Sequence, residues 1–455
     1  MKEFKRAISL LLALALAVCC TGTAFAATRT EDTGLAVSYL PEELTDAPDI
    51  QAGAAVLMDV KTGTILYEKN ADEQLYPASI TKIMTALITL EECELEDIVT
   101  FSDNAVYGTE AGSSTAGIAA GAELTVEETL YAMLLVSANE AATALAEHVS
   151  GSVEDFAALM TQRAQELGCT GTQFTNANGM PDEEHYTTAH DMALILEEAL
   201  HYEAFRTISG TKSYTIADRD TLYSEIELWN HFKMLYSTHE YYYEYAEGGK
   251  TGYTTAANST LATFAAKDGV ELLCIILNDT GSGNHYKDTE ALYEWGFAQV
   301  AYAAPLEGYD ITASLNEEQL ALYETLGCTY ESDYTLLVSA GSEDLTVSFV
   351  ESADQTGGVF GYLLIQDGDE TADRVPVTFD TSTEAAQSYL YPEAEETESE
   401  AAPEASTEQG GGVLKYLLVL AAVAVVILAL VLLRLWGAGR RRSRSGTYRG
   451  RRRRR

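Results

Sequence analysis

The chain has 455 residues with a formal net charge of −42, and 47% of the residues are hydrophobic. This length exceeds that of one ordinary domain and is sufficient for a large buried core. Eleven arginines lie between Arg434 and Arg455, so residues 27–433 carry an even larger negative charge of about −55. So much negative charge excludes nucleic acid as a partner of that part of the chain.

The beginning of the chain is typical of a secretory signal peptide. Three basic residues precede an apolar run, which ends in the small-residue cleavage pattern Ala24-Phe25-Ala26. We therefore expect residues 1–26 to be removed on export, and we expect residues 27–48 to form a linker.

Residues 49–300 are predicted to form one domain of mixed α/β (α+β) class. Strand-like runs, among them Ala54–Met58 and Thr260–Ala266, flank a middle part with helical periodicity. This order predicts an antiparallel sheet with helices on both faces and an additional helical lobe. The expected position of a functional site is between the sheet and the lobe.

A serine and a lysine stand one helical turn apart in this domain, in Ser79-Ile80-Thr81-Lys82. Pro77 precedes them and apolar residues follow at helical spacing as far as Leu90, so Ser79 is expected in the first turn of a buried helix. A serine hydroxyl becomes a nucleophile when a base accepts its proton. Apolar neighbours and a second nearby cation both lower the pKa of a lysine, which makes it a usable base.

Two other short motifs follow, Ser137-Ala138-Asn139 and Lys250-Thr251-Gly252. The first interrupts an apolar helical stretch, where polar side chains either bond to one another or face a cleft. The second precedes a strand-like run, where its lysine is placed to bind a carboxylate and its glycine permits close approach to the backbone. Together with Ser79 and Lys82, these motifs predict an acylating serine site.

Each motif alone is weak, because the chain repeats the patterns elsewhere. Ser209-Gly210-Thr211-Lys212 is a second S-x-x-K, and Lys61-Thr62-Gly63 is a second K-T-G. No helix is expected around Ser209, and Lys61–Gly63 lies between two strand-like runs as the turn of a hairpin. Sequence context therefore favours Ser79 as the nucleophile.

As a set, these residues resemble the low-molecular-mass penicillin-binding D-alanyl-D-alanine carboxypeptidases of serine peptidase family S11. The resemblance extends over roughly residues 45–300. It implies a β-lactamase/transpeptidase-like fold. It is carried by the segments Val56–Asp59, Leu66–Asp72, Pro77–Thr85, Phe174–Asp182, His185–Ala193 and Trp295–Phe297.

The resemblance also implies catalytic roles for three residues. Ser79 is the implied acyl-ester nucleophile, Lys82 its proton acceptor and Ser137 a proton relay. Neither a metal ion nor a cofactor is implied.

Substrate binding is implied for a second set of residues. Asn139 corresponds to a residue that binds the substrate amide, and Lys250, Thr251 and Gly252 to the motif that binds the terminal carboxylate. The backbone N–H groups of Tyr253 and of the nucleophile correspond to the oxyanion hole, where donors stabilise the developing negative charge.

The implied reaction is removal of the terminal D-alanine from peptidoglycan pentapeptide stems that end in D-Ala-D-Ala, with β-lactams as inhibitors. Two alternatives stay open: a β-lactamase-like acyl-serine hydrolase and a non-enzymatic penicillin-binding scaffold of the cell wall. Class A β-lactamases carry a glutamate in an E-x-x-L-N segment. Leu167–Thr172 has no such glutamate, which disfavours the first alternative.

Three features depart from the family pattern. Asn258 stands where the family often has glycine, and His231 stands near the position of an arginine that helps some members bind the carboxylate. A tyrosine-rich run occupies residues 236–245. It is interpretable either as a rim that stacks on a stem peptide or as a solvated, partly packed loop insertion.

The remainder of the chain is predicted to hold a second domain and a membrane anchor. Alternating strands predict a small β-rich domain over residues 305–382, and acidic composition predicts a disordered linker over residues 383–412. Residues 413–436 are predicted to form a transmembrane helix, with an arginine-rich tail at 437–455. The positive-inside rule places this tail in the cytoplasm and the catalytic domain outside the cell membrane, facing the wall.

Cysteine and histidine spacing predicts no metal site. The seven histidines form no H-E-x-x-H motif, and the cysteines that follow the signal peptide have no zinc-binding or C-x-x-C spacing. Buried thiols are expected, and the spacing leaves an occasional disulfide open. These cysteines are Cys93, Cys169, Cys274 and Cys328.

Overall fold

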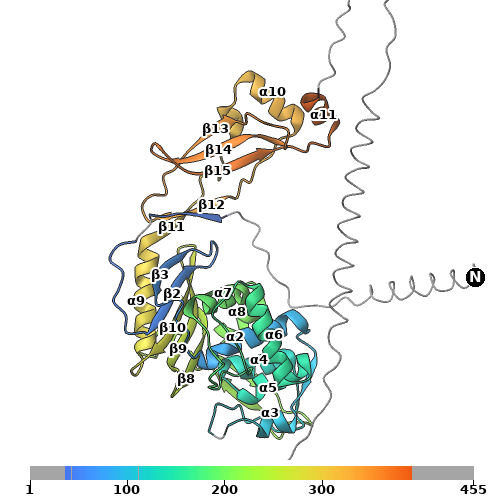
Figure 1. The fold of residues 1–455 in the computed structure, drawn as a ribbon, viewed down its shortest axis with the longest axis vertical. Coiled ribbons are helices and arrows are strands. Elements are labelled where there is room, and N and C mark those ends of the chain that lie inside the picture. The colour runs from blue at the N-terminus through green and yellow to red at the C-terminus, as the bar shows by residue number, and fades with distance from the viewer. Residues whose placement is uncertain (1–35, 42–43, 111, 392–455) are drawn as a thin grey trace, which may run out of the picture. The chain divides into compact units, whose positions relative to one another are not determined.

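The computed structural model of the protein describes residues 36–41, 44–110 and 112–391 (Figure 1). The predicted signal peptide, the transmembrane segment 413–436 and the tail 437–455 lie outside these residues. Within the described ranges, no helix is long and apolar enough to cross a membrane.

A five-stranded antiparallel sheet forms the centre of the first 300 residues. Its strand order is β3-β2-β10-β9-β8, so β8 is an edge strand. The predicted antiparallel sheet is therefore present. The strand that carries Lys250 is one of its two edge strands. The strands are β2 (Ala54–Asp59), β3 (Ile65–Lys69), β8 (Ala246–Thr254), β9 (Asn258–Lys267) and β10 (Val270–Asp279).

The sheet is buried on both faces. Successive side chains of a strand point to opposite faces, and the strands here are apolar on both. In β2, Val56 and Met58 belong to one hydrophobic core, whereas Leu57 between them belongs to a second core. Helix α9 packs on the second face, and helices of the lobe cover the first, as predicted (Figure 1).

Six helices build the lobe and the first core. Several begin at a capping residue: Thr125 forms a capping box with Glu128, and Ser152 and Thr188 each accept a hydrogen bond from the first turn. The helices are α2 (Lys82–Glu92), α4 (Val126–Leu135), α5 (Asn139–Ser150), α6 (Val153–Glu166), α7 (Ala189–Leu200) and α8 (Glu203–Gly210).

Short elements complete the lobe. A 3₁₀ turn precedes α2, and a second one follows β7. Two small antiparallel pairs, β4 with β5 and β6 with β7, lie at its margin. The bounds are η1 (Ala78–Thr81), β4 (Ile98–Thr100), α3 (Asp103–Tyr107), β5 (Glu123–Thr125), β6 (Ser213–Ile216), β7 (Ile226–Trp229) and η2 (Lys233–Leu235).

Helix α2 is the central element of the lobe. Every residue from Lys82 to Leu90 is buried, including the lysine itself. A helix that is buried on all sides has no solvated face on which a lysine would normally lie. The burial of Lys82 therefore requires polar partners, and these are described below.

A third hydrophobic core belongs to the residues after 300. Strand β1 (Ala36–Tyr39) pairs in parallel with β12 (Thr335–Ser339), so part of the predicted linker 27–48 is a strand. Helix α11 (Glu384–Leu390) likewise lies in the range 383–412, where disorder is predicted. The remaining elements are α9 (Asn284–Gln299), β11 (Val300–Ala303), η3 (Ile311–Ser314), α10 (Glu317–Leu326), β13 (Thr346–Glu351), β14 (Val359–Asp367) and β15 (Glu370–Thr378).

Candidate active site

Ser79 lies in the 3₁₀ turn η1, directly before α2. The turn is held against the sheet, because Thr260 Oγ1 donates a 2.8 Å hydrogen bond to the carbonyl of Pro77. Ala78 has a φ of +50°, a left-handed conformation that is unfavourable for alanine and is typical of backbone strain at functional sites. The sheet thus presents Ser79 at the junction of β8 and the lobe.

Lys82 is fully buried and points at the serine. Its Nζ lies 3.0 Å from Ser79 Oγ, 2.7 Å from Asn139 Oδ1 and 2.6 Å from the carbonyl of Asn178. Burial, together with the nearby Lys250, holds the pKa of Lys82 well below its ordinary value. A lysine with a lowered pKa can accept the proton of the serine hydroxyl.

The loop that contacts Lys82 is fixed by its own hydrogen bonds. Asn176 Oδ1 accepts from the N–H of Gly179, and Thr85 Oγ1 of α2 donates to the carbonyl of Ala177. Gly179 has a φ of +84°, and a side chain on it would collide with the carbonyl of Ala78. The glycine is therefore required for the loop to pass beside the nucleophile.

His185 contacts η1 through Thr81 and does not line the cavity. Its Nδ1 accepts from the N–H of Thr175, so its Nε2 carries the proton and donates to Thr81 Oγ1 at 2.9 Å. Burial lowers the pKa of His185 to about 4, so the ring is neutral at physiological pH. It positions the turn rather than acting as a base.

The Ser137 motif connects α4 to α5. Ser137 has a φ of +60° and is 5% exposed, and its hydroxyl has no hydrogen-bond partner among the residues described. Asn139 is the first residue of α5, and its Oδ1 accepts from Lys82. Ser137 and Asn139 both line the cavity at Ser79, so the structure brings two of the three motifs together.

Glu140 is a buried residue of the site that sequence reasoning missed. Its Oε1 accepts from Thr115 Oγ1 and from the N–H groups of Ala116 and Gly117, at 2.6 to 3.0 Å. Its charge raises the pKa of Lys82, in opposition to burial. An acidic residue directly after S-x-N at the start of an apolar helix is the sequence signal by which it could have been found.

The third motif lies on the edge strand β8. Lys250 is 2% exposed, and its Nζ donates to the carbonyl of Thr251 at 2.7 Å. Burial lowers its pKa to about 7, so the charge of the ammonium depends on pH in the neutral range. Thr251, Gly252 and Tyr253 line the cavity, and a β carbon on Gly252 would come within 2.9 Å of the N–H of Ser79.

Ser79 lies at one open cavity of about 900 Å³, whose described lining includes neither Lys82 nor Lys250. Ser79, Ser137, Asn139, Thr251 and Tyr253 all contribute to its lining. A nucleophile next to a base of lowered pKa, a hydroxyl without a partner and a buried cation are the components of acyl transfer.

The second S-x-x-K and the second K-T-G lie away from this cavity. Lys61–Gly63 forms the turn between β2 and β3, as predicted. The expectation of no helix around Ser209 is wrong, because Ser209 lies in α8. Its hydroxyl donates to the carbonyl of Phe205 at 2.7 Å, and Lys212 follows the end of the helix. Ser209 therefore bonds to the backbone of its own helix and lies outside the cavity lining.

The departures from the family pattern have structural counterparts. Asn258 has a φ of +57°, a left-handed conformation in which glycine and asparagine are the favoured residues. His231 lines the cavity, and burial together with Lys250 lowers its pKa. A neutral imidazole at this position supplies a hydrogen bond rather than a fixed charge.

The tyrosine-rich run has features of both interpretations, and stacking on a stem peptide stays a prediction. Tyr243 and Tyr245 pack on α9, with Tyr243 stacked on Tyr293 at 5.6 Å between ring centroids. Tyr241 instead lines the cavity and stacks on Tyr286 at 4.9 Å. Four tyrosines of the run thus pack on the second core, and one of these rings, Tyr241, also reaches the site.

The cysteines of the described chain are free thiols. Burial is the main cause that raises the pKa of each of them, to about 12 for Cys169 and about 11 for Cys328. Thiols of this kind are unreactive at neutral pH.

Comparison with protein families agrees with this geometry. The model of a family described as D-alanyl-D-alanine carboxypeptidase matches residues 42–281. The chain is 33% identical over 254 residues to D-alanyl-D-alanine carboxypeptidase DacF of Bacillus subtilis, covering 55% of this chain and 63% of that protein. It is 30% identical over 279 residues to DacC of Escherichia coli, covering 59% and 67%. The chain thus spans about two thirds of the length of these relatives.

Solved structures are similar as well. A D-alanyl-D-alanine carboxypeptidase of Mycobacterium tuberculosis is 29% identical, with a TM-score of 0.52 over 57% of this chain and 96% of that one. The Streptomyces K15 DD-transpeptidase is 30% identical, with a TM-score of 0.52 over 56% and 100%. Penicillin binding protein 6B of Escherichia coli is 22% identical, with a TM-score of 0.60 over 75% and 99%. This last likeness concerns the fold alone, and it supports the predicted mixed α+β architecture.

Proposed function

Because the chain belongs to the D-alanyl-D-alanine carboxypeptidase family, we propose that it removes the terminal D-alanine from peptidoglycan stem peptides ending in D-Ala-D-Ala. The observation that carries the proposal is the contact of 3.0 Å between Lys82 Nζ and Ser79 Oγ at the cavity. In this proposal, each step of the reaction is assigned to residues of the described chain.

Acylation begins with transfer of the Ser79 hydroxyl proton to neutral Lys82. The serine oxygen then forms a bond to the carbonyl carbon of the penultimate D-alanine. The backbone N–H groups of Ser79 and Tyr253 are placed to stabilise the negative charge that develops on the carbonyl oxygen. A carboxylate at the end of the peptide is held by Lys250 and Thr251, with Asn139 at the substrate amide.

Collapse of this intermediate breaks the C–N bond and releases D-alanine. Its amine nitrogen receives a proton from Lys82 through the hydroxyl of Ser137, which has no partner in the described structure. Water then attacks the ester carbonyl carbon and gives one proton to the same relay. The C–O bond to Ser79 breaks, the serine oxygen takes a proton back from Lys82, and the shortened peptide is released. β-Lactams imitate the dipeptide and acylate the same oxygen.

The test uses the exported part of the protein with a pentapeptide and a fluorescent penicillin. Wild-type protein is expected to release D-alanine and to be labelled covalently, whereas Ser79→Ala is expected to do neither. Ser209→Ala is the matched control, since it alters the other S-x-x-K and leaves the cavity intact. D-Alanine release by the Ser79→Ala protein would contradict the mechanism.

Two further outcomes of this assay separate the alternatives. Labelling without release from any peptide would favour the non-enzymatic scaffold. Rapid turnover of penicillin would favour the β-lactamase-like hydrolase.

We also propose that the protein is held in the cell membrane by residues 413–436, with residues 437–455 in the cytoplasm and the site facing the wall. The support is the charge asymmetry and the apolar run in the sequence, which lie outside the described residues. A chain that ends after residue 391 is expected in the culture medium, and the full chain in the membrane fraction. Equal amounts of both in the medium would contradict the anchor.

A further inference from the structure

A group of cationic and aromatic side chains extends the cavity away from Ser79. Lys233, Tyr241, His285 and Tyr286 all line it. The Nζ of Lys233 lies 5.8 Å from the ring centroid of Tyr241 and 6.0 Å from that of Tyr286. The two rings are stacked, so the ammonium group lies over an aromatic platform.

Two polar groups of this cluster have no hydrogen-bond partner among the described residues. The exposed ammonium of Lys233 has no hydrogen bond or ion pair within the described part of the chain. The Nδ1 of His285 is buried there without a hydrogen-bond partner. Burial and the nearby Lys233 lower the pKa of His285 to about 4, so this ring is neutral at physiological pH.

The surroundings favour an anion. Helix α9 begins at Asn284 without a side-chain cap, and Gly283 and His285 at its start line the cavity. A helix N-terminus has free N–H groups and a positive partial charge. Among the described lining residues, Glu110 is the one carboxylate and Lys233 the one lysine or arginine.

The aromatic part of the platform is held in place by packing. Phe232 and Met234, on either side of Lys233, are both buried, and Tyr286 is 3% exposed. The carbonyl of Met234 accepts from the N–H of Tyr243, which is itself packed on α9. Rings that are already packed lose little side-chain freedom when a ligand binds.

We propose that this platform binds a second carboxylate of the peptide substrate, distinct from the terminal one assigned to Lys250. The proposal rests on the proposed function, and it names the substrate class as peptides with an additional carboxylate. Such a group is found on the third residue of stems that contain diaminopimelate. A charged hydrogen bond to Lys233 accounts for the recognition.

The experiment compares kcat/KM for D-alanine release from three pentapeptides with diaminopimelate, amidated diaminopimelate or lysine at the third position. Wild-type protein is expected to favour the diaminopimelate peptide over the other two by about 10-fold, through KM. In Lys233→Gln that ratio is expected to fall to about 2-fold.

Lys267→Gln is the matched control, since Lys267 lies 4.7 Å over the ring of Tyr245 but does not line the cavity. Its substrate ratio is expected to equal that of the wild type. Equal kcat/KM for all three peptides in the wild type, or an unchanged ratio in Lys233→Gln, would overturn the platform. The proposed function fails by a different result, the absence of D-alanine release from every peptide.

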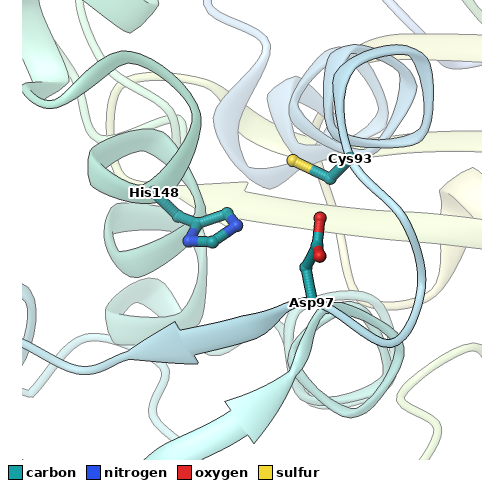
Figure 2. Close-up of side chains that lie close together, drawn as sticks. All are labelled: Cys93, Asp97 and His148. Carbon is teal, nitrogen blue, oxygen red and sulfur yellow. The ribbon is translucent and has the colours of Figure 1, made fainter. Parts of the chain in front are cut away.

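A second and independent group lies at the other end of α2. Figure 2 shows Cys93, Asp97 and His148 pointing toward a common position from three places in the lobe. Cys93 follows α2, Asp97 lies before β4, and His148 is in the last turn of α5. One ligand atom of each lies within 4.8 Å of the other two.

The charges around the thiol favour a cation. The carboxylates of Asp97, Glu92 and Glu94 lie close enough to act electrostatically on the Cys93 thiol. The Oε2 of Glu94 is buried without a hydrogen-bond partner in the described ranges. A bound divalent cation would relieve this accumulation of negative charge.

The geometry points to a site for a zinc-like divalent ion with Cys93, Asp97 and His148 as protein ligands. Thiolate, imidazole and carboxylate together are a ligand set of zinc, with water at a fourth position. Binding releases the thiol proton to solvent, and the ion connects the end of α2 to α5. Sequence spacing does not predict this group, because position 148 is distant from the other two ligands along the chain.

Co²⁺ added to the full protein is expected to produce a thiolate-to-cobalt absorption band and to release one proton per ion. Cys93→Ser is expected to abolish the band, and His148→Ala to weaken binding by at least about 10-fold. Cys328→Ser is the matched control, because that thiol is outside the group. Absence of the band in the wild type, or its persistence in Cys93→Ser, would overturn the site.

Discussion

Two buried lysines lie at one site, and the proposed chemistry requires opposite charge states of them. Lys82 must be neutral to accept a proton, and burial together with Lys250 holds its pKa below the ordinary value. Lys250 must be charged to bind a carboxylate, and burial lowers its pKa to about 7. Each lysine also lowers the proton affinity of the other, so the protonation of the pair is linked.

The pH dependence of D-alanine release follows from this arrangement. We expect kcat/KM to fall at low pH as Lys82 gains a proton, and to fall at high pH as Lys250 loses one, with an apparent pKa of about 7. A bound carboxylate stabilises charged Lys250, so the alkaline limb of kcat should lie at higher pH than that of kcat/KM. A kcat/KM that rises steadily to alkaline pH would contradict the assigned role of Lys250.

The burial of Lys250 also predicts an effect on stability. The folded pKa of about 7 is below the ordinary 10.5, so the unfolded chain binds more protons between these values and stability rises with pH there. Lys250→Met is therefore expected to raise the melting temperature by several degrees below pH 7. The difference from the wild type should shrink as the pH is raised toward 10. A melting temperature that falls at every pH would show that the ammonium stabilises the fold.

Glu140 provides a test of the role of Lys82 as the base. Its charge raises the pKa of Lys82, so Glu140→Gln is expected to shift the acid limb of kcat/KM to lower pH. The glutamine oxygen can still accept the hydrogen bonds of residues 115–117. Glu147→Gln on the same helix is the control, and an equal shift in both variants would contradict a local effect.

At the scale of elements, the close packing of β8 against η1 creates the site. Gly252 allows this approach, because a β carbon there would collide with Thr260 and come within 2.9 Å of the N–H of Ser79. Gly252→Ala is expected to slow penicillin acylation by about 100-fold, since it displaces an oxyanion donor. Stopped-flow labelling measures this rate. Gly357→Ala, which has open space around it, should acylate at the wild-type rate.

At the scale of the whole molecule, the first described strand belongs to a sheet formed by strands from residue 300 onward. Strand β1 pairs with β12, and Tyr39 packs against the third core and donates a hydrogen bond to Glu370. Deletion of residues 27–39 is expected to destabilise the region after residue 300 by about 2 kcal/mol. Calorimetry should resolve a lowered transition, whereas penicillin acylation should be unchanged. An unchanged thermogram would contradict a structural role for β1.

Local pattern was sufficient to predict much of the fold. The strands of the central sheet, the burial of α2 and the Lys61–Gly63 turn all follow from apolar periodicity and turn residues, which act within a few residues of the chain. Strand β1 and helix α11 were missed, because each is stabilised by contacts with segments distant in sequence. The helix around Ser209 was missed for the same reason.

The sequence by itself determined the family of this protein, the identity of its three motifs and their order, because these depend on residue types and spacing. Only the tertiary structure decided how they act on one another. It placed Lys82 3.0 Å from Ser79, lowered the pKa of Lys250 to about 7 and brought Glu140 and Lys233 to the site. The physical reason is that pKa values and contacts depend on distance and burial, and segments far apart in the chain set both.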